Sequence, residues 1–360
     1  VDVQSVAEQK VMGKDIIDSI PTSRSNFSIA TMIAGMNTDN PSDVGGKNSI
    51  GLVRLTSHGS RTGDQRITID GLAIDSAECN GDCSGYLVNM GGVEELAVDY
   101  LSGSADFENG GVRVNAIPKQ GGNLFSGSMF VGGMKGGPPD NSSNGWMQGN
   151  NLTPELIARG LVVPTDIRKL WDINPGVGGP LKKDTLWFYA AYMNRGEHAY
   201  NGAWANKNAG DPTKWHYEPA TNVQKIETFR QQTSKQLRLT WQANDKNKLA
   251  FFYDFQERCS CPDRLGPQQM PESQTAWHYR YNDYAQLSWS SPVTSRLLLE
   301  AGIGRHPEHL VSPSAEPADV FDPYPSNGGL RALDGLIPVT EQSTGMIYRG
   351  FNGSGDGMFD

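Results

Sequence analysis

The sequence predicts a mainly β protein in two parts: an α+β domain over residues 1–121, then antiparallel transmembrane β-barrel strands over residues 122–360. The barrel is expected to be incomplete in this chain. Two observations lead to this prediction. Polar and apolar residues alternate through residues 235–257 on both sides of a short polar turn, as in a β-hairpin with two different faces. Along the second part, short turns alternate with long loops rich in Gly, Pro and Asn.

The composition favours sheet and excludes one class of partner. The chain of 360 residues is long enough to bury a sizeable core in two or three domains. Its 42 glycines, 8 tryptophans and 12 tyrosines suit a sheet-rich protein with polar loops. A formal net charge of -9 argues against a nucleic-acid surface, which needs clustered Lys and Arg. No run approaches the roughly 18 apolar residues of a membrane helix, but barrel strands are short and only alternately apolar.

The first part of the chain is predicted to contain short strands, helices and tight turns. Asp70 and Gly71 separate the alternating runs ITI and LAI, which predicts a tight hairpin because Gly tolerates a positive φ. Glu94 and Glu95 are neighbours on a predicted strand, so their side chains should point to opposite faces rather than form a carboxylate pair. The glycines expected to permit tight turns or close backbone approach are Gly103, Gly110, Gly111, Gly121 and Gly122.

Hairpins follow one another in the second part. The predicted strands are residues 122–133, 171–180, 185–194, 234–243, 248–257, 278–290 and 296–304. The predicted short turns are 182–184, 244–247 and 291–295, and the predicted long loops are 134–170, 195–233, 258–277 and 305 onward. Every short turn then lies at one end of the sheet and every long loop at the other, as in outer-membrane barrels, whereas soluble sandwiches have short loops at both ends.

The apolar faces of these strands are predicted to contact lipid. The residues concerned are Leu237, Leu239, Trp241, Leu249, Phe251 and Phe255. The strand aromatics alone would fit a sandwich core equally well. The opposite faces carry Arg238, Gln242 and Asp254, which favours a polar lumen filled by water or by a plug. In the sixth strand the same alternation groups Tyr279 with the outward residues and Arg280 with the inward ones.

Two segments carry a family resemblance. QRITIDGLAI (65–74) and VEELAVDYLSGSADFENGGVRVNAIPKQGGNLFSGSMF (93–130), with DIIDSIPTSRSNFSIATMIAGM (15–36) upstream, resemble the plug domain of TonB-dependent outer-membrane transporters, most closely the Oar-like branch. The motif residues are Asp70, Gly71, Glu94, Glu95, Gly110, Gly111, Asn115, Lys119, Gly121 and Gly122. The resemblance implies a plug inside the barrel, the periplasmic energy coupler TonB as partner, and residence in the lipid of a bacterial outer membrane. One departure is His58, where family plugs often carry Arg before Gly; Arg54, Arg61 and Arg113 are the substitutes for a plug-barrel ion pair.

The strand spacing predicts a longer protein. Seven strands occupy residues 122–304, about 26 residues each, so the 22 strands of a plugged transporter would need roughly 570 residues. We therefore expect this chain to be an amino-terminal portion, with the TonB box at or before Val1.

The four cysteines form two close pairs. Cys79 and Cys83 flank the turn residues Asn-Gly-Asp and are predicted to form a disulfide, with a metal site and free thiols as the alternatives. Cys259 and Cys261 are a less favourable pair, because one intervening residue forces a strained ring. Neither pair has the partners of a zinc site, and the segment HPEH (306–309) is interpreted as surface histidines in a polar loop.

Two functions remain open at this point. The sequence has no GxSxG, P-loop or HExxH motif, so no enzyme and no cofactor or metal is predicted. The first function is active uptake of a scarce solute, such as an iron complex, a cofactor, an oligosaccharide or a peptide. The alternative is a secreted or surface-exposed β-rich binding or adhesion protein without transport. Extraction from membranes distinguishes them, because only the first should require detergent.

Overall fold

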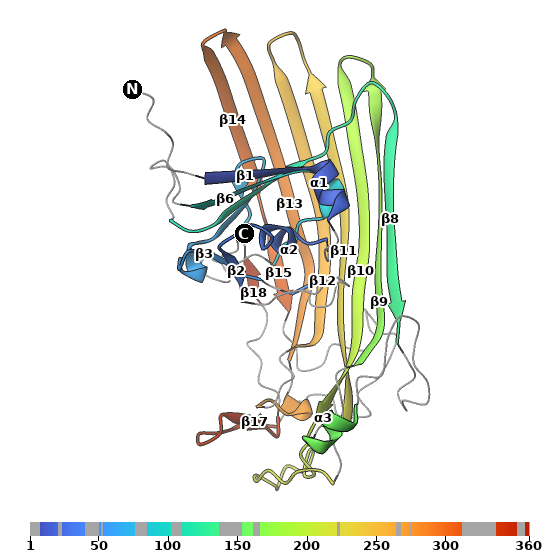
Figure 1. Ribbon diagram of the computed structural model, residues 1–360, viewed down its shortest axis with the longest axis vertical. Helices are drawn as coiled ribbons and strands as arrows, with labels where there is room; N and C mark the ends of the chain where they lie inside the picture. The colour runs from blue at the N-terminus through green and yellow to red at the C-terminus, as the bar shows by residue number, and fades with distance from the viewer. Residues whose placement is uncertain are drawn as a thin grey trace.

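The protein is mainly β, as expected, and its described residues form a nine-stranded sheet, a five-stranded sheet and two sheets of two strands each, β2-β3 and β16-β17 (Figure 1). The computed structural model describes residues 8–20, 24–39, 50–51, 53–75, 85–101, 110–136, 153–160, 166–221, 224–263, 268–273, 275–311, 336–350 and 357–359. No helix among these residues is long and apolar enough to cross a membrane.

The larger sheet, here called the wall, is antiparallel and has nine strands in the order β18-β15-β13-β12-β11-β10-β9-β8, with β14 also paired to β13. Its strands are β8 (Ser126–Lys135), β9 (Asp166–Lys182), β10 (Leu186–Ala203), β11 (Gln224–Gln242), β12 (Lys248–Asp263), β13 (Thr275–Thr294), β14 (Leu297–Arg305), β15 (Glu308–Val311) and β18 (Gly357–Phe359). The wall is open, because β8 and β14 do not pair with each other. The antiparallel barrel-type sheet is therefore confirmed, and the barrel is incomplete in this chain.

All seven predicted strands are present, but most are longer than predicted. The expected loops 195–233 and 258–277 were wrong in extent, since β10 continues to Ala203 and β13 already begins at Thr275. The first strand was also placed early and starts at Ser126. The alternation of polarity marks only the part of a strand with one apolar face, whereas the backbone ladder continues where both faces are polar.

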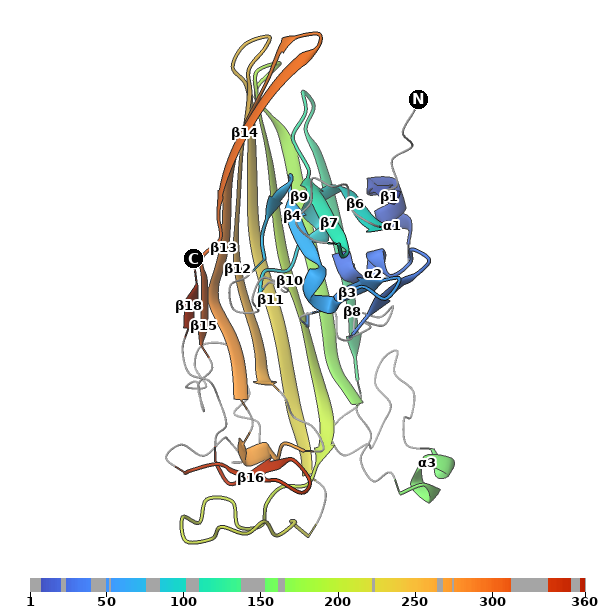
Figure 2. The ribbon, with the colours of Figure 1, turned by 90° about the vertical axis from the view of Figure 1, so that its left-hand side faces the viewer.

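Turns and loops divide between the two ends of the wall. The connections at residues 183–185, 243–247 and 295–296 are short and lie together at one end. At the other end lie α3 (Pro154–Ala158), η4 (Pro271–Ser273), β16 (Val339–Glu341) and β17 (Met346–Tyr348), as Figures 1 and 2 show. This is the asymmetry that the sequence predicted.

The smaller sheet belongs to the first part of the chain, called the plug here for the described residues up to 121. Its strand order is β1-β6-β7-β4-β5, with β4 parallel to β7 and the other pairs antiparallel. The strands are β1 (Glu8–Gly13), β4 (Arg66–Ile69), β5 (Leu72–Ala73), β6 (Val93–Leu101) and β7 (Arg113–Pro118). The other plug elements are α1 (Lys14–Ser19), α2 (Asn26–Ala30), β2 (Met36–Thr38), β3 (Leu55–Ser57), η1 (Thr62–Asp64) and η3 (Met90–Gly92).

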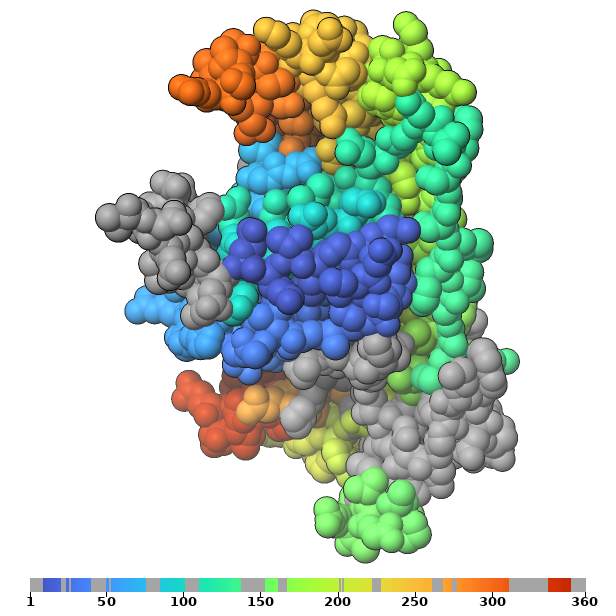
Figure 3. Space-filling view, turned by 45° about the horizontal axis from the view of Figure 1, so that its top comes forward, coloured from blue at the N-terminus to red at the C-terminus, as the bar shows by residue number. Residues whose placement is uncertain are grey.

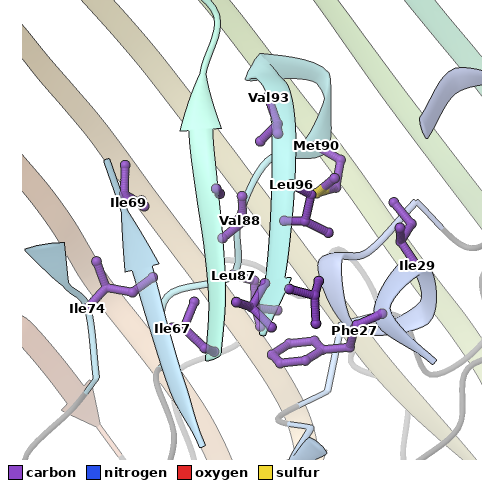
Figure 4. Packing of buried hydrophobic residues seen from close by; sticks show 14 of the residues in the cluster. Phe27, Ile29, Ile67, Ile69, Ile74, Leu87, Val88, Met90, Val93 and Leu96 are labelled. Atoms are coloured by element: carbon purple, nitrogen blue, oxygen red, sulfur yellow. The ribbon is translucent and has the colours of Figure 1, made fainter. Parts of the chain in front are cut away.

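Apolar side chains of the plug form a core of their own (Figure 4). Its members include Phe27, Ile29, Ile67, Ile69, Ile74, Leu87, Val88, Met90, Val93 and Leu96. Burying a side chain of this size contributes about 1.5–3 kcal/mol, so the plug has its own source of stability. Phe252 and Tyr284 of the wall join the same cluster. The plug thus packs on the concave face of the wall, between β8 at one edge and β13 and β14 at the other (Figures 2 and 3).

Candidate functional site: the interface between plug and wall

The closest plug-wall contact is made by residues 85–92, sequence GYLVNMGG, which we call the docking segment. All eight residues are buried. The segment ends in η3, directly before β6, and lies across the inner faces of several wall strands. Inward positions of the wall are mostly polar, so the segment meets hydrogen-bonding side chains as well as aromatic rings such as that of Tyr284.

Leu87 is held through its backbone. Its N–H donates to Oε1 of Gln256 at 3.2 Å, and its carbonyl oxygen accepts from Nε2 of Gln232 at 3.0 Å and from Nε2 of Gln256 at 2.8 Å. Gln232 lies on β11 and Gln256 on β12. Two neighbouring strands therefore bind one peptide unit of the plug, although the side chain of Leu87 belongs to the plug core.

Tyr86 donates its hydroxyl hydrogen to Asp254 on β12, at an oxygen-oxygen distance of 2.5 Å. Asp254 also accepts from Ser234 at 2.8 Å, from Gln236 at 3.0 Å and from Gln256 at 2.8 Å, so four side chains satisfy this fully buried carboxylate. Burial, followed by the charge of Asp254, raises the pKa of Tyr86 well above its ordinary value. The Tyr86 hydroxyl therefore stays protonated and remains a donor at physiological pH.

Three residues at the end of the docking segment lie against β9 and β11. Asn89 accepts from Nδ2 of Asn174 at 2.7 Å. A Cβ atom at Gly91 would lie 2.1 Å from Oδ1 of Asn174, and one at Gly92 would lie 1.9 Å from Oε1 of Gln236. Only glycine allows the backbone to approach the wall this closely without a shift of the wall side chains.

A second attachment joins the Asp70-Gly71 hairpin to β11. Arg238 forms an ion pair with Asp70 in which Nη1 and Oδ2 lie 2.7 Å apart, and it donates to the carbonyl oxygen of Pro118 at 3.1 Å. Burial raises the pKa of Asp70, and Arg238 lowers it only in part. This ion pair reverses the polarity expected from the family: the arginine belongs to the wall and the carboxylate to the plug.

The hairpin itself is as predicted. Asp70 and Gly71 have φ values of 45° and 83°, which a type I′ turn requires. Asn115 holds the turn from the neighbouring strand, since its Oδ1 accepts from the N–H of Gly71 at 3.0 Å and from Oγ1 of Thr68 at 2.9 Å. Asn115 thus supports the residue that pairs with Arg238. His58, by contrast, is exposed, and Arg54 pairs within the plug with Asp39 at 3.7 Å.

Lys119 and Gly121 lie where the chain passes from plug to wall. Lys119 donates from Nζ to the carbonyl oxygen of Gly91 at 2.9 Å, and burial lowers its pKa. A Cβ atom at Gly121 would lie 2.2 Å from the carbonyl oxygen of Phe188, so the connection needs glycine there. Gly111 is similarly confined, because a Cβ would lie 2.3 Å from the carbonyl oxygen of Asp64.

The remaining motif residues have less to do with this interface. A Cβ atom at Gly110 or Gly122 would meet nothing within 4 Å. Glu94 is exposed and Glu95 half-buried, with an irregularity in the β6-β7 register between Val93 and Glu95. No described contact joins these four residues to the wall, so their role stays a prediction.

The six residues predicted to contact lipid lie on the outer face of β11 and β12. Leu237, Trp241 and Phe251 are 36%, 47% and 38% exposed, and Leu239, Leu249 and Phe255 are intermediate. They alternate with inward residues such as Arg238 and Asp254, which are buried against the plug. Whether lipid covers this face is not decided by the alternation, so the contact with lipid remains a prediction.

Two expectations near β13 were wrong. Tyr279 is fully buried on the inner face and Arg280 is exposed, the reverse of the predicted order. Irregularities in the pairing of β12 with β13 and of β13 with β15 shift the alternation by one residue there. His306 is also not a surface residue: Nε2 of its ring lies 2.8 Å from the acceptor Oδ1 of Asn282, and the ring packs edge-on against Tyr86, with ring centres 5.8 Å apart.

The structure tests the cysteine predictions only in part. Cys79 and Cys83 lie outside the described residues. Cys259 is disulfide-bonded, while its pairing with Cys261 stays a prediction. Within the described part of the chain, no three His, Cys, Asp or Glu side chains gather as metal ligands would.

The sequence did not single out the docking segment or its glutamine partners. Tyr86, Leu87 and Asn89 lie in a short segment without a regular pattern, and Gln232 lies in a stretch that was predicted to be loop. The one available signal was the polar side of each strand, which identified Arg238 and Asp254 as inward but not their partners.

An open antiparallel wall, apolar outside and mostly polar inside, with a plug bound to its inner face, is the arrangement found in plugged outer-membrane barrels. Solved structures with this arrangement are similar to the chain. A mutant ferric enterobactin receptor from Pseudomonas aeruginosa in complex with enterobactin matches 99% of this chain with a TM-score of 0.58 and 14% identity. The siderophore receptor PirA from Acinetobacter baumannii matches 97%, with a TM-score of 0.58 and 14% identity. The outer membrane transporter YddB from Escherichia coli matches 84%, with a TM-score of 0.51 and 13% identity.

This chain therefore has the plug-and-barrel fold of the TonB-dependent outer-membrane receptors. It spans less than half the length of these structures, namely 45%, 43% and 39% of the three chains. Protein-family models and curated protein sequences give no match.

Proposed function

We propose that this chain supplies the plug and the amino-terminal part of the barrel of a TonB-dependent receptor in the bacterial outer membrane. The receptor takes up a scarce solute actively and is not an enzyme. Residues 1–121 act as the plug domain and residues 122–360 as barrel with long extracellular loops. The short-turn end faces the periplasm, where TonB couples the energy of the inner membrane to the plug.

The observation that carries the proposal is the way the wall holds the docking segment. Leu87 is bound by Gln232 and Gln256 through backbone hydrogen bonds, and Tyr86 is bound by Asp254. Such bonds can be exchanged for bonds to water, so the plug can leave the wall with most of its apolar core intact.

The solute is proposed to be an iron complex in the first instance. The solved structures of this fold include receptors for ferric enterobactin and another siderophore receptor, which favours this choice. A cofactor, an oligosaccharide or a peptide are the other candidates, and the Oar-like branch remains a prediction. No nucleic acid is expected as a partner.

Uptake in a strain with and without TonB tests the proposal. Cells that express the complete protein should accumulate an iron-siderophore complex only when TonB is present, and detergent should be required to extract the protein from membranes. If salt or alkali releases the protein without detergent, the alternative of a secreted or surface binding protein replaces this one. If the protein stays in the membrane but takes up none of the four solute classes, transport is the wrong activity, and if uptake is the same without TonB, the coupling to TonB is wrong.

A further inference from the structure

Two buried arginines lie in one row across the wall. Cross-strand pairing places Asp172 on β9 beside Arg195 on β10, Arg195 beside Gln232 on β11, Gln232 beside Arg258 on β12, and Arg258 beside Tyr279 on β13. We call these five residues the arginine row. Antiparallel strands lie about 4.8 Å apart, so the two arginine backbones are separated by roughly 10 Å with one glutamine between them.

Both guanidinium groups keep donors without a partner. Arg195 is 3% exposed and donates from Nε and Nη2 to Oε1 of Gln232 at 2.9 and 2.7 Å, which leaves Nη1 unbonded. Arg258 is 4% exposed and stacks over the ring of Tyr279 at 4.3 Å, with Nε and Nη1 unbonded. Buried donors without acceptors are rare in native proteins, and for a charged group each one calls for an acceptor.

The acceptors inside the row do not meet this need. Asp172 is the one carboxylate of the row, and its charge attracts that of Arg195, but its Oδ1 has no hydrogen-bond partner, so it does not occupy the unbonded Nη1 of Arg195. Oε1 of Gln232 is already used by Arg195, and Nε2 of Gln232 donates to Leu87 and Gln256. The row therefore carries two positive groups against one negative group, with free N–H bonds on the positive ones.

From this geometry we propose that Arg195 and Arg258 bind an anionic oxygen group, a carboxylate or a phosphate, of the transported solute. The proposal rests on the proposed function of uptake and adds to it the chemical class of the solute. Guanidinium groups present planar N–H donors that match such oxygens, and seclusion from water strengthens each contact. Gln232 links the site to the plug, because the same side chain holds Arg195 and the carbonyl of Leu87.

The test is calorimetric titration of the complete detergent-solubilised protein with citrate, with inorganic phosphate and with the neutral triol glycerol. At least one of the two anions should bind saturably, and glycerol should not. Arg195→Gln and Arg258→Gln should each weaken anion binding about tenfold or more, the loss expected for a hydrogen bond to a charged group. Arg280→Gln is the matched control, because Arg280 lies next to the row on the opposite, exposed face of β13.

Arg195→Lys and Arg258→Lys keep the positive charge, so they replace a glutamine variant in the binding measurement if that variant does not fold. Each should bind the anion more weakly than the wild type and more strongly than its glutamine counterpart. The inference is overturned if neither anion binds, or if Arg280→Gln loses as much affinity as the row variants. Uptake measurements separate failure of this inference from failure of the proposed function. If both glutamine variants keep unchanged TonB-dependent uptake, only the role of the arginine row is contradicted. If the protein binds the anion but shows no TonB-dependent uptake, only the transport proposal is contradicted.

Discussion

Arg238 of the wall and Asp70 of the plug form an ion pair at 2.7 Å in which the side chains are only 10% and 18% exposed. Arg238 also donates to Pro118, at the end of the strand that carries Asn115. One arginine therefore contacts both the hairpin of the plug and the exit of the chain toward the wall. The geometry makes this pair the natural place to test how firmly the plug is held.

Removing the arginine should weaken docking more than removing the carboxylate. Arg238→Met leaves Asp70 buried without its cation and should destabilise the docked plug by about 1–3 kcal/mol. Asp70→Asn alone should have a smaller effect, because burial already disfavours the charged form. The double variant should recover part of the loss. Hydrogen exchange of peptides covering residues 66–73 measures the opening free energy, and a double variant worse than Arg238→Met would contradict the prediction.

Docking should also depend on pH through Asp70. Burial raises the pKa of Asp70 above its ordinary value, so this carboxyl binds a proton at a higher pH in the folded protein than in the unfolded chain. Its contribution to stability is then complete below the unfolded pKa and is lost as the pH rises through the folded pKa. The stability of the wild type relative to Asp70→Asn should fall from about pH 4 upward. If the stability difference between the wild type and Asp70→Asn stays constant or rises with pH, the attraction of Arg238 lowers the pKa of Asp70 more than burial raises it.

A disulfide between plug and wall should stop transport. A Cβ atom at Gly91 would lie 2.5 Å from Cγ of Asn174, and since that carbon is about 1.5 Å from its own Cβ, the two Cβ atoms lie within about 4 Å. Gly91→Cys with Asn174→Cys should crosslink, abolish uptake, and regain it on reduction. Thr240→Cys with Ala250→Cys joins paired residues of the wall and is the control that should leave uptake intact. Full uptake through a closed Gly91-Asn174 link would mean that the docking segment need not move.

A charge on the outer face should be penalised according to depth. Leu239→Arg should destabilise the protein in lipid vesicles by about 2–4 kcal/mol if it lies near the bilayer midplane, and Trp241→Arg, nearer the turn, by about 0–1 kcal/mol. Urea titration in vesicles measures both. Depth-sensitive spin labels provide the independent check: labels at 239 and 251 should report lipid, and labels at 238 and 254 should not.

The cysteine pair near the docking segment remains to be tested chemically. Cys79 and Cys83 should resist alkylation until a reductant is added, because the turn residues between them allow the approach that a disulfide requires. Mass spectrometry of the alkylated protein decides the question. Modification of both thiols without reductant would exclude the bond.

The sequence predicted the strands well and the interface poorly, for a physical reason. Alternation along β11 and β12 comes from local contact with two different environments, so residues such as Leu239 and Arg238 are assigned to faces without knowledge of their neighbours. The contact between Tyr86 and Asp254 joins residues 168 positions apart, and no local pattern encodes it. Tyr279 was placed on the wrong face because a pairing irregularity shifts the alternation without leaving a mark in the residue types.

The open edges of the wall have a practical consequence for anyone who prepares this chain by itself. Among the described strands, β8 and β14 each pair on one side only, so their other sides carry backbone N–H and C=O groups that no described strand pairs with. Leu297, Leu298 and Ile303 on β14 are 48%, 55% and 70% exposed. Long apolar strands with unpaired backbones join other copies edge to edge. We therefore expect the isolated chain to aggregate in detergents that keep a closed barrel dispersed.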